Sequence, residues 1–108
     1  MKIVQGTITC KETNEIPIGS VVFITISKDS NTIGHQTMQR IDTFPFKYRI
    51  EVNDQSKETA ANAQNWSIRV NIENGEQTIF LNENGSLSIT PPEVDLENLD
   101  IQVNVQQC

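Results

Sequence analysis

The sequence lacks most of the residue patterns that catalysis or metal binding requires. It has one histidine, His35, and two cysteines, Cys10 and Cys108, which lie far apart along the chain. Structural zinc sites need several convergent His or Cys ligands, so no zinc site is expected. No Gly-x-Ser-x-Gly elbow and no glycine-rich phosphate loop occurs. We therefore predict no catalytic residue, no cofactor and no metal, and expect His35 to be a surface or satisfied polar residue and not a ligand.

Positive charge is also scarce. Lys and Arg number 8 against 14 Asp and Glu, and the formal net charge is −6. Without a basic cluster, an acidic chain repels phosphate backbones and anionic membrane surfaces, so nucleic-acid binding is not expected. The acidic stretch 93–100 lacks the calcium-loop pattern and is interpreted as solvated. A small hydrolase would need converging carboxylates, which the sequence alone does not indicate.

Long apolar runs are absent as well. No run approaches the roughly 20 residues that a membrane-spanning helix requires. The first residues carry a single Lys and reach Gln5 and Gly6 after two apolar residues, which is neither a signal peptide nor a lipobox. We expect a cytoplasmic location by default, or the cell envelope if a leader has been removed.

The two cysteines do not indicate a disulfide framework. In a strand over 3–10, Cys10 shares the inward face of Val4 and Ile8. In a strand over 99–106, continued alternation places Cys108 outward. A bond would require the C-terminus to bend, so we favour Cys10 as a free, small apolar side chain.

What the chain does contain is β-branched residues in strand-like patterns. The stretch 16–29 opens with Pro17 and Gly19 and continues almost wholly β-branched or aromatic over 20–26. Val22, Ile24 and Ile26 share one face, and Val21 and Phe23 share the other. This pattern predicts a central strand with both faces covered at its start.

Further strands are predicted by alternation and turn residues along the whole chain, at 3–10, 32–40, 44–52, 65–73, 77–82, 86–90 and 99–106. The segment 53–64 is the exception, since 55–61 could form a turn or two of helix without an apolar stripe. We predict a single domain over 1–108 that is all-β, an antiparallel sandwich of about seven or eight short strands.

The cleanest alternation places Trp66, Ile68 and Val70 on one face, with Trp66 as a core anchor. Asn74 and Gly75 follow as a hairpin signal, and a two-residue turn there pairs Ile79 with Val70. That register leaves Phe80 on the outer face. At the next Asn-Gly, residues 84–85, the registers do not agree, and either a bulge or a crossing between sheets would resolve them.

Four segments resemble a known family. Residues 17–26 resemble the PPGAVVTVTL stretch of YbaY-like and YscW-like lipoproteins, 33–38 its IGEQTI segment, 44–48 its FPFxF element, and 66–72 with the following Asn-Gly its YTVSARI strand and turn. The resemblance spans roughly 3–105 and implies an immunoglobulin-like β-sandwich. It also implies a non-enzymatic envelope lipoprotein, or a pilotin, which is a lipid-anchored chaperone for a type III secretin. The start of this chain departs from that pattern because it has no lipobox cysteine.

We therefore expect a chaperone-like module that binds a protein through an apolar groove or a strand edge, with no membrane span; the sequence does not indicate an oligomeric state. Candidate contact residues are the outward apolar side chains Val21, Phe23 and Phe80. The alternative is a structural or accessory sandwich domain with no ligand of its own, in which a second sheet or loop covers these side chains.

Overall fold

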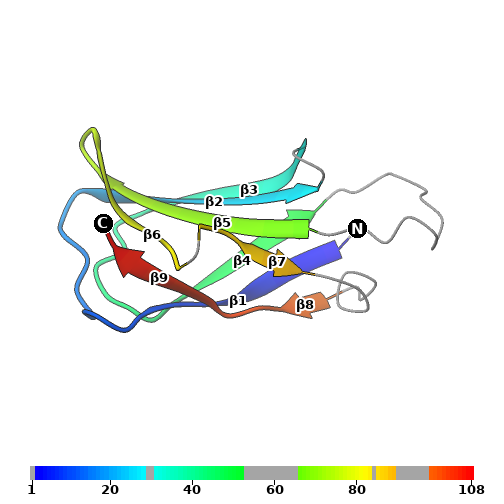
Figure 1. Ribbon diagram of the computed structural model, residues 1–108, viewed down its shortest axis with the longest axis horizontal. Helices are drawn as coiled ribbons and strands as arrows, with labels where there is room; N and C mark the ends of the chain where they lie inside the picture. The colour runs from blue at the N-terminus through cyan, green and yellow to red at the C-terminus, as the bar shows by residue number, and fades with distance from the viewer. Residues whose placement is uncertain (1, 29–30, 53–65, 84, 90–97) are drawn as a thin grey trace.

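The computed structural model describes residues 2–28, 31–52, 66–83, 85–89 and 98–108, and within these ranges it is all-β (Figure 1). The possible helical turn at 55–61 and the acidic stretch at 93–97 lie outside the described residues. The described residues form nine strands: β1 (Lys2–Cys10), β2 (Ser20–Lys28), β3 (Asn31–Gln39), β4 (Phe46–Val52), β5 (Trp66–Asn74), β6 (Gln77–Asn82), β7 (Leu87–Ile89), β8 (Asn98–Asp100) and β9 (Val103–Gln107).

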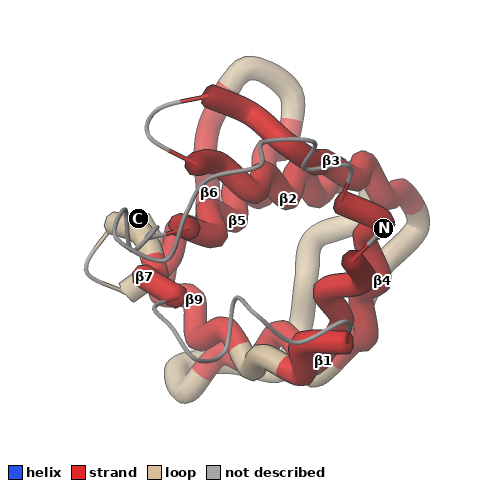
Figure 2. The backbone as a smooth tube through the Cα atoms, turned by 90° about the vertical axis from the view of Figure 1, so that its right-hand side faces the viewer, coloured by secondary structure: helices blue, strands red, loops and turns tan. Residues whose placement is uncertain are grey.

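The strands form one continuous mixed sheet instead of the predicted immunoglobulin-like antiparallel sandwich. The order is β3-β2-β5-β6-β9-β1-β4, with β7 added to β5 and β8 added to β1. Strand β6 pairs with both β5 and β9, so it joins what would otherwise be two separate layers. Both β8 and β9 run parallel to β1. The result is an elongated, barrel-like body with extents of 44 × 21 × 21 Å (Figure 2).

The two ends of this sheet, β3 and β4, lie against each other and nearly close the barrel. Gly34 permits the approach, because a Cβ at this position would lie 3.0 Å from a methyl carbon of Ile50. The side-chain oxygen of Gln36 accepts a hydrogen bond from the backbone N–H of Arg49 at 3.2 Å. Each strand edge is therefore partly covered by the other.

The core fills the barrel with side chains from alternate positions, as the sequence predicts for β2 and β5. Val22, Ile24 and Ile26 are buried and pair with Ile72, Val70 and Ile68. Trp66 is buried, which confirms it as a core anchor. The remaining buried apolar side chains are Val4, Ile8, Ile16, Phe44, Tyr48, Ile50, Val52, Phe80, Leu99, Val103 and Val105.

The predicted register of the β5–β6 hairpin, and with it the outward orientation of Phe80, is wrong. The turn residues are Gly75 and Glu76, and the register shifts by one residue between Ile72 and Glu73. Ile79 is the extra residue on β6, so Phe80 pairs with Ile72 and points inward, with 2% of its surface exposed. A bulge has this effect because side chains alternate with a period of two residues.

The disagreement in register after residue 82 is resolved by a change of partner. Strand β7 does not pair with β6; it returns to β5, where Ile89 lies opposite Trp66. Between the β6 and β7 pairings, the buried side chain of Asn82 accepts a hydrogen bond from the Val70 N–H and donates one to the Ile68 carbonyl at 3.0 Å. One side chain thus satisfies the backbone of β5 where no strand does.

The last predicted strand, 99–106, is broken into β8 and β9 at residues 101–102. The Ile101 N–H donates to the Gln5 carbonyl at 2.8 Å, and the Ile101 carbonyl accepts from the Tyr48 hydroxyl at 2.7 Å. A Cβ at Gly6 would lie 1.9 Å from the Ile101 carbonyl oxygen, so only glycine fits there. The chain therefore bends at Ile101, and one predicted strand becomes the two strands β8 and β9.

Both cysteines are free. Cys10 is half-buried and packs against the core, whereas Cys108 is exposed. His35 is exposed on β3, as expected for a surface residue.

Tyr48 makes the stability of the fold decrease at alkaline pH. Burial raises the pKa of its phenol well above the ordinary 10.0, and the charge of Asp100 acts in the same direction. The folded state therefore keeps a proton that the unfolded state releases above pH 10. We expect the free energy of unfolding to lose up to about 1.4 kcal/mol per pH unit from this group above pH 10, and none below it.

Tyr48→Phe tests this pH dependence, because Tyr48 is the sole tyrosine of the chain. We expect the variant to be about 1–2 kcal/mol less stable near neutral pH, since the buried Ile101 carbonyl loses its donor. The difference from the parent should shrink as the pH rises above 10, when urea unfolding is followed at each pH. A constant difference up to pH 12 would contradict this role for Tyr48.

Replacing Asn82 should destabilise the fold, because its side chain bonds backbone groups of β5 that no neighbouring strand pairs. Asn82→Leu keeps a comparable volume but leaves the Val70 N–H and the Ile68 carbonyl buried without partners, so we expect a loss of about 3 kcal/mol. Asn31→Leu, on the exposed start of β3, is the matched control, with an expected change within about 0.5 kcal/mol. Equal stabilities of the two variants in urea unfolding would rule out the bridging role of Asn82.

Candidate partner-binding surface

One end of the barrel carries two adjoining clefts. The loops at 11–19 and 40–45, the β5–β6 hairpin and the C-terminal residues meet there, at the left of Figure 1. The larger opening, the Phe80 cleft, has a volume of about 800 Å³; the smaller, the Val21 cleft, has about 440 Å³. Ile18 and Asp42 line both. We call the group Ile16, Ile18, Val21, Ile41, Ile79 and Phe80 the end surface.

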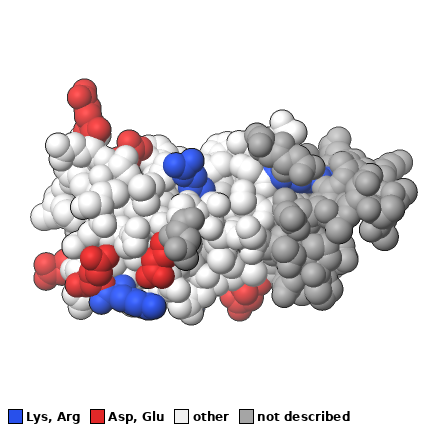
Figure 3. All heavy atoms as spheres, in the orientation of Figure 1, with Lys and Arg blue, Asp and Glu red and all other residues white. Residues whose placement is uncertain are grey.

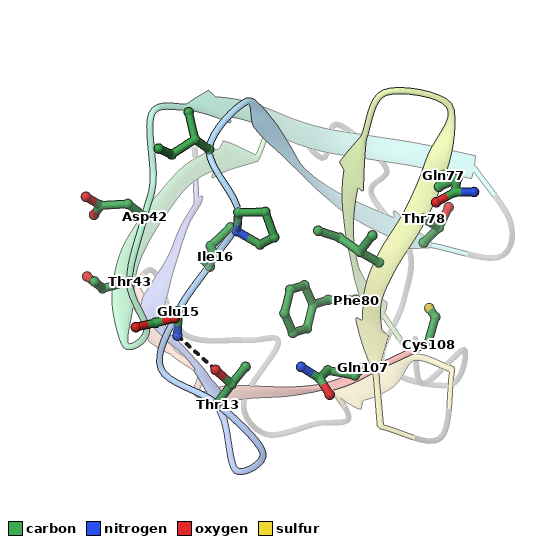
Figure 4. A pocket seen from close by; sticks show the side chains of 13 residues that line it. Thr13, Glu15, Ile16, Asp42, Thr43, Gln77, Thr78, Phe80, Gln107 and Cys108 are labelled. Atoms are coloured by element: carbon green, nitrogen blue, oxygen red, sulfur yellow. Dashed lines mark hydrogen bonds between the residues drawn. The ribbon is translucent and has the colours of Figure 1, made fainter.

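The floor of the Phe80 cleft is apolar and firmly packed. Figure 4 shows the Phe80 ring pointing into the cleft across from Ile16. Behind it, Phe44 meets the Phe80 ring edge to face, with the centroids 5.2 Å apart and the planes at 74°. Ile16 and Phe44 are 3% and 5% exposed, so the floor is an extension of the core.

The two loops that carry this floor are joined through their backbones. The Ile16 N–H donates to the Asp42 carbonyl at 3.0 Å, and the Phe44 N–H donates to the Asn14 carbonyl at 2.9 Å. These bonds flank a single β-bridge between Glu15 and Thr43. The wall of the cleft is therefore preformed.

Ile18 stands at the rim between the clefts with 96% of its surface exposed, and it is held there by its backbone. The Asn74 amide donates to the Ile18 carbonyl at 3.1 Å and to the Ser20 hydroxyl at 3.2 Å. Ser20 in turn donates to the Pro17 carbonyl from its hydroxyl, at 2.6 Å, and from its N–H, at 3.2 Å. These bonds fix the backbone of the turn from which the Ile18 side chain projects into solvent.

The Val21 cleft lies on the other side of Ile18. Val21 and Ile41 supply its apolar lining, and Arg40, with a left-handed φ of 61°, lies at the end of β3 beside them. Val21 and Ile41 are both half-buried. The apolar surface thus continues from one cleft to the next past Ile18.

The three predicted contact residues are only partly brought together. Val21 and Phe80 line neighbouring clefts, Phe80 from inside the barrel instead of from its outer face. Phe23 is half-buried on the outer face of β2, opposite Thr37 and Asn71, and lines neither cleft. Alternation alone gives no reason to select Ile18, although its place between Pro17 and Gly19 marks it as an apolar residue in a turn.

The end surface consists of apolar side chains, and the rim of the Phe80 cleft adds polar ones. Among the described residues, no three His, Cys, Asp or Glu side chains group in a way that could hold a metal ion. No helix in the described part of the chain is long and apolar enough to cross a membrane. Apolar side chains, two carboxylates and several amides and hydroxyls line the Phe80 cleft.

A family model described as "Type III secretion system lipoprotein chaperone (YscW)" matches residues 1–101. The chain belongs to this family. YscW proteins are chaperones and not enzymes, which agrees with the prediction of no enzymatic activity. No curated protein matches the chain.

The fold of this YscW-family chain is also similar to a solved structure described as an alternative pilotin from the type II secretion system of Vibrio cholerae. The TM-score is 0.75 at 17% identity, and the match covers 99% of this chain and 96% of that one. At this identity the likeness establishes the shared fold.

Asn74 should control how rigidly Ile18 is presented. We expect Asn74→Ala to release the turn at 17–20, so that the Ser20 amide exchanges its hydrogen about fivefold faster, as the loss of about 1 kcal/mol predicts. Exchange at Val70, in the centre of the sheet, serves as the internal control in an NMR measurement. Unchanged exchange at Ser20 would show that Asn74 does not brace the turn.

Proposed function

We propose that this YscW-family chain is a chaperone that binds a protein client at its end surface, and that the client is a secretin subunit. The family description supports a chaperone of a secretion system, and the sequence resemblance supports a secretin as the protein it accompanies. The proposal places the chain in the cell envelope, where secretins assemble. The client would cover Ile18 and fill the Phe80 cleft.

The observation that carries this proposal is the exposure of Ile18 beside a preformed cleft with an apolar floor. Single exposed apolar side chains are common on protein surfaces and by themselves mean little. Ile18 differs because its backbone is braced by Asn74 and because apolar side chains line the clefts on both sides. Burying an isoleucine contributes about 1.5–3 kcal/mol, which gives this residue a plausible share of a binding free energy.

A groove is better supported than strand addition. The open ends of the sheet, β3 and β4, face each other, and Gln36 already caps the N–H of Arg49. A client strand would have to separate these strands where Gly34 packs against Ile50. At the end surface, by contrast, a client needs no rearrangement of the described strands.

Two substitutions on different faces test the proposal. Ile18→Asp places a charge on the end surface, and Phe23→Asp places the same charge on the outer face of β2. Binding to a purified secretin subunit is measured by calorimetry. We expect Ile18→Asp to weaken binding at least about 30-fold, in the range of interface hot spots, and Phe23→Asp to leave it within about twofold.

Thermal unfolding controls for folding of both variants. Because Ile18 is exposed, we expect Ile18→Asp to change the free energy of unfolding by less than about 0.5 kcal/mol. The reverse pattern, with Phe23→Asp abolishing binding, would move the site to the outer face of β2. No binding by the parent protein would leave the accessory-domain alternative.

A further inference from the structure

The charges around the Phe80 cleft have one sign. Glu15 and Asp42 stand on its rim, and no Lys or Arg is among the described residues that line it. Both are exposed, and Figure 4 shows them on the same side of the cleft, Asp42 above Ile16 and Glu15 below it, with their carboxylates directed outward to solvent. Within the described part of the chain neither carboxylate pairs with a cationic side chain.

The backbones of Glu15 and Asp42 are fixed in the two loops that carry the apolar floor. The Asp42 carbonyl accepts the hydrogen bond of Ile16, and the Glu15 N–H donates to the Thr13 hydroxyl at 3.1 Å. Glu15 also forms the β-bridge with Thr43. Two negatively charged residues therefore stand on the rim of a cleft whose floor is formed by Phe80 and Ile16.

We propose that the cleft is specific for a client segment in which a large apolar side chain is followed or preceded closely by Lys or Arg. The apolar side chain enters between Ile16 and Phe80, and the cation contacts Glu15 or Asp42. This inference rests on the proposed function, since it names the chemistry of the client at the same surface. Charge complementarity of this kind favours the right partner and speeds encounter.

The expected size of the effect follows from the exposure of the two carboxylates. Exposed ion pairs contribute little, so each carboxylate should change the dissociation constant by about twofold to fivefold. Their contribution is screened by salt, and at about 1 M ionic strength the screening length is only about 3 Å. The apolar contact persists at high salt, because screening does not weaken it.

Three blocked peptides with a central Phe provide the probe. They differ only in the residues that flank the Phe: Lys in the first, Gln in the second and Glu in the third. Each is titrated into the full chain, and backbone amide shifts in the loops at 13–20 and 40–44 report binding by NMR. We expect the Lys peptide to bind about tenfold more tightly than the Glu peptide at low salt, with the Gln peptide between them.

Charge-neutralised variants complete the test. The ranking of the peptides should collapse in Glu15→Gln/Asp42→Asn and at about 1 M salt. A matched control, Glu51→Gln/Asp100→Asn, removes the same two chemical groups from exposed positions on β4 and β8, and should keep the ranking.

The outcomes separate this inference from the proposed function. Equal binding of the three peptides, abolished by Ile18→Asp, overturns the preference for cations but leaves the end surface as the binding site. A collapse of the ranking in the matched control as well shows an effect of net charge alone and also overturns the inference. No amide shift with any peptide overturns it too, and the secretin measurement then decides the proposed function separately.

Discussion

The architecture of the end that carries the clefts depends on the one-residue bulge in β6. By adding Ile79 to one strand of the hairpin, it rotates Phe80 from the outer face into the barrel. Phe80 then packs against Phe44, and the loops that carry Phe44 and Ile16 are bonded to each other over it. Without the bulge, the alternation of β6 would place Phe80 on the outer face, and the cleft would have no floor. A local backbone irregularity thus creates the feature on which the proposed binding depends.

In a sheet that curves almost into a barrel, backbone N–H and C=O groups also need hydrogen-bond partners where neighbouring strands separate. Asn82 provides them between β6 and β7, and Tyr48 provides one between β8 and β9, each with a buried polar group aimed at main-chain atoms. Such groups are stabilising only while every partner is in place. The paired strands β2 and β5 supply seven of the buried apolar side chains of the core, and the other strands and loops supply the rest.

The sequence predicts the strands well, because period-two alternation in stretches such as 20–26 and 66–72 records burial directly. It predicts a two-sheet sandwich where the structure has one nearly closed sheet. The pairing of β6 with both β5 and β9 depends on contacts between distant segments. The break at Ile101 depends on the space beside Gly6, which no local pattern records. For the site, alternation finds Val21 as a half-exposed apolar residue, but it places Phe80 on the wrong face and overlooks Ile18. Bulges and braced turns are tertiary features, and they determine this surface.

In the space-filling view, acidic side chains, with some basic ones beside them, are visible at the same end of the molecule as the clefts (Figure 3). If a client binds as we propose, it covers this end and leaves the far end of the barrel free. Hydrogen–deuterium exchange of the chain, alone and saturated with a purified secretin subunit, tests it most directly. The account predicts new protection in the loops at 13–20 and 40–44 and in β6, with β7 and β8 unchanged. Protection confined to β7, β8 or the outer face of β2 would contradict it.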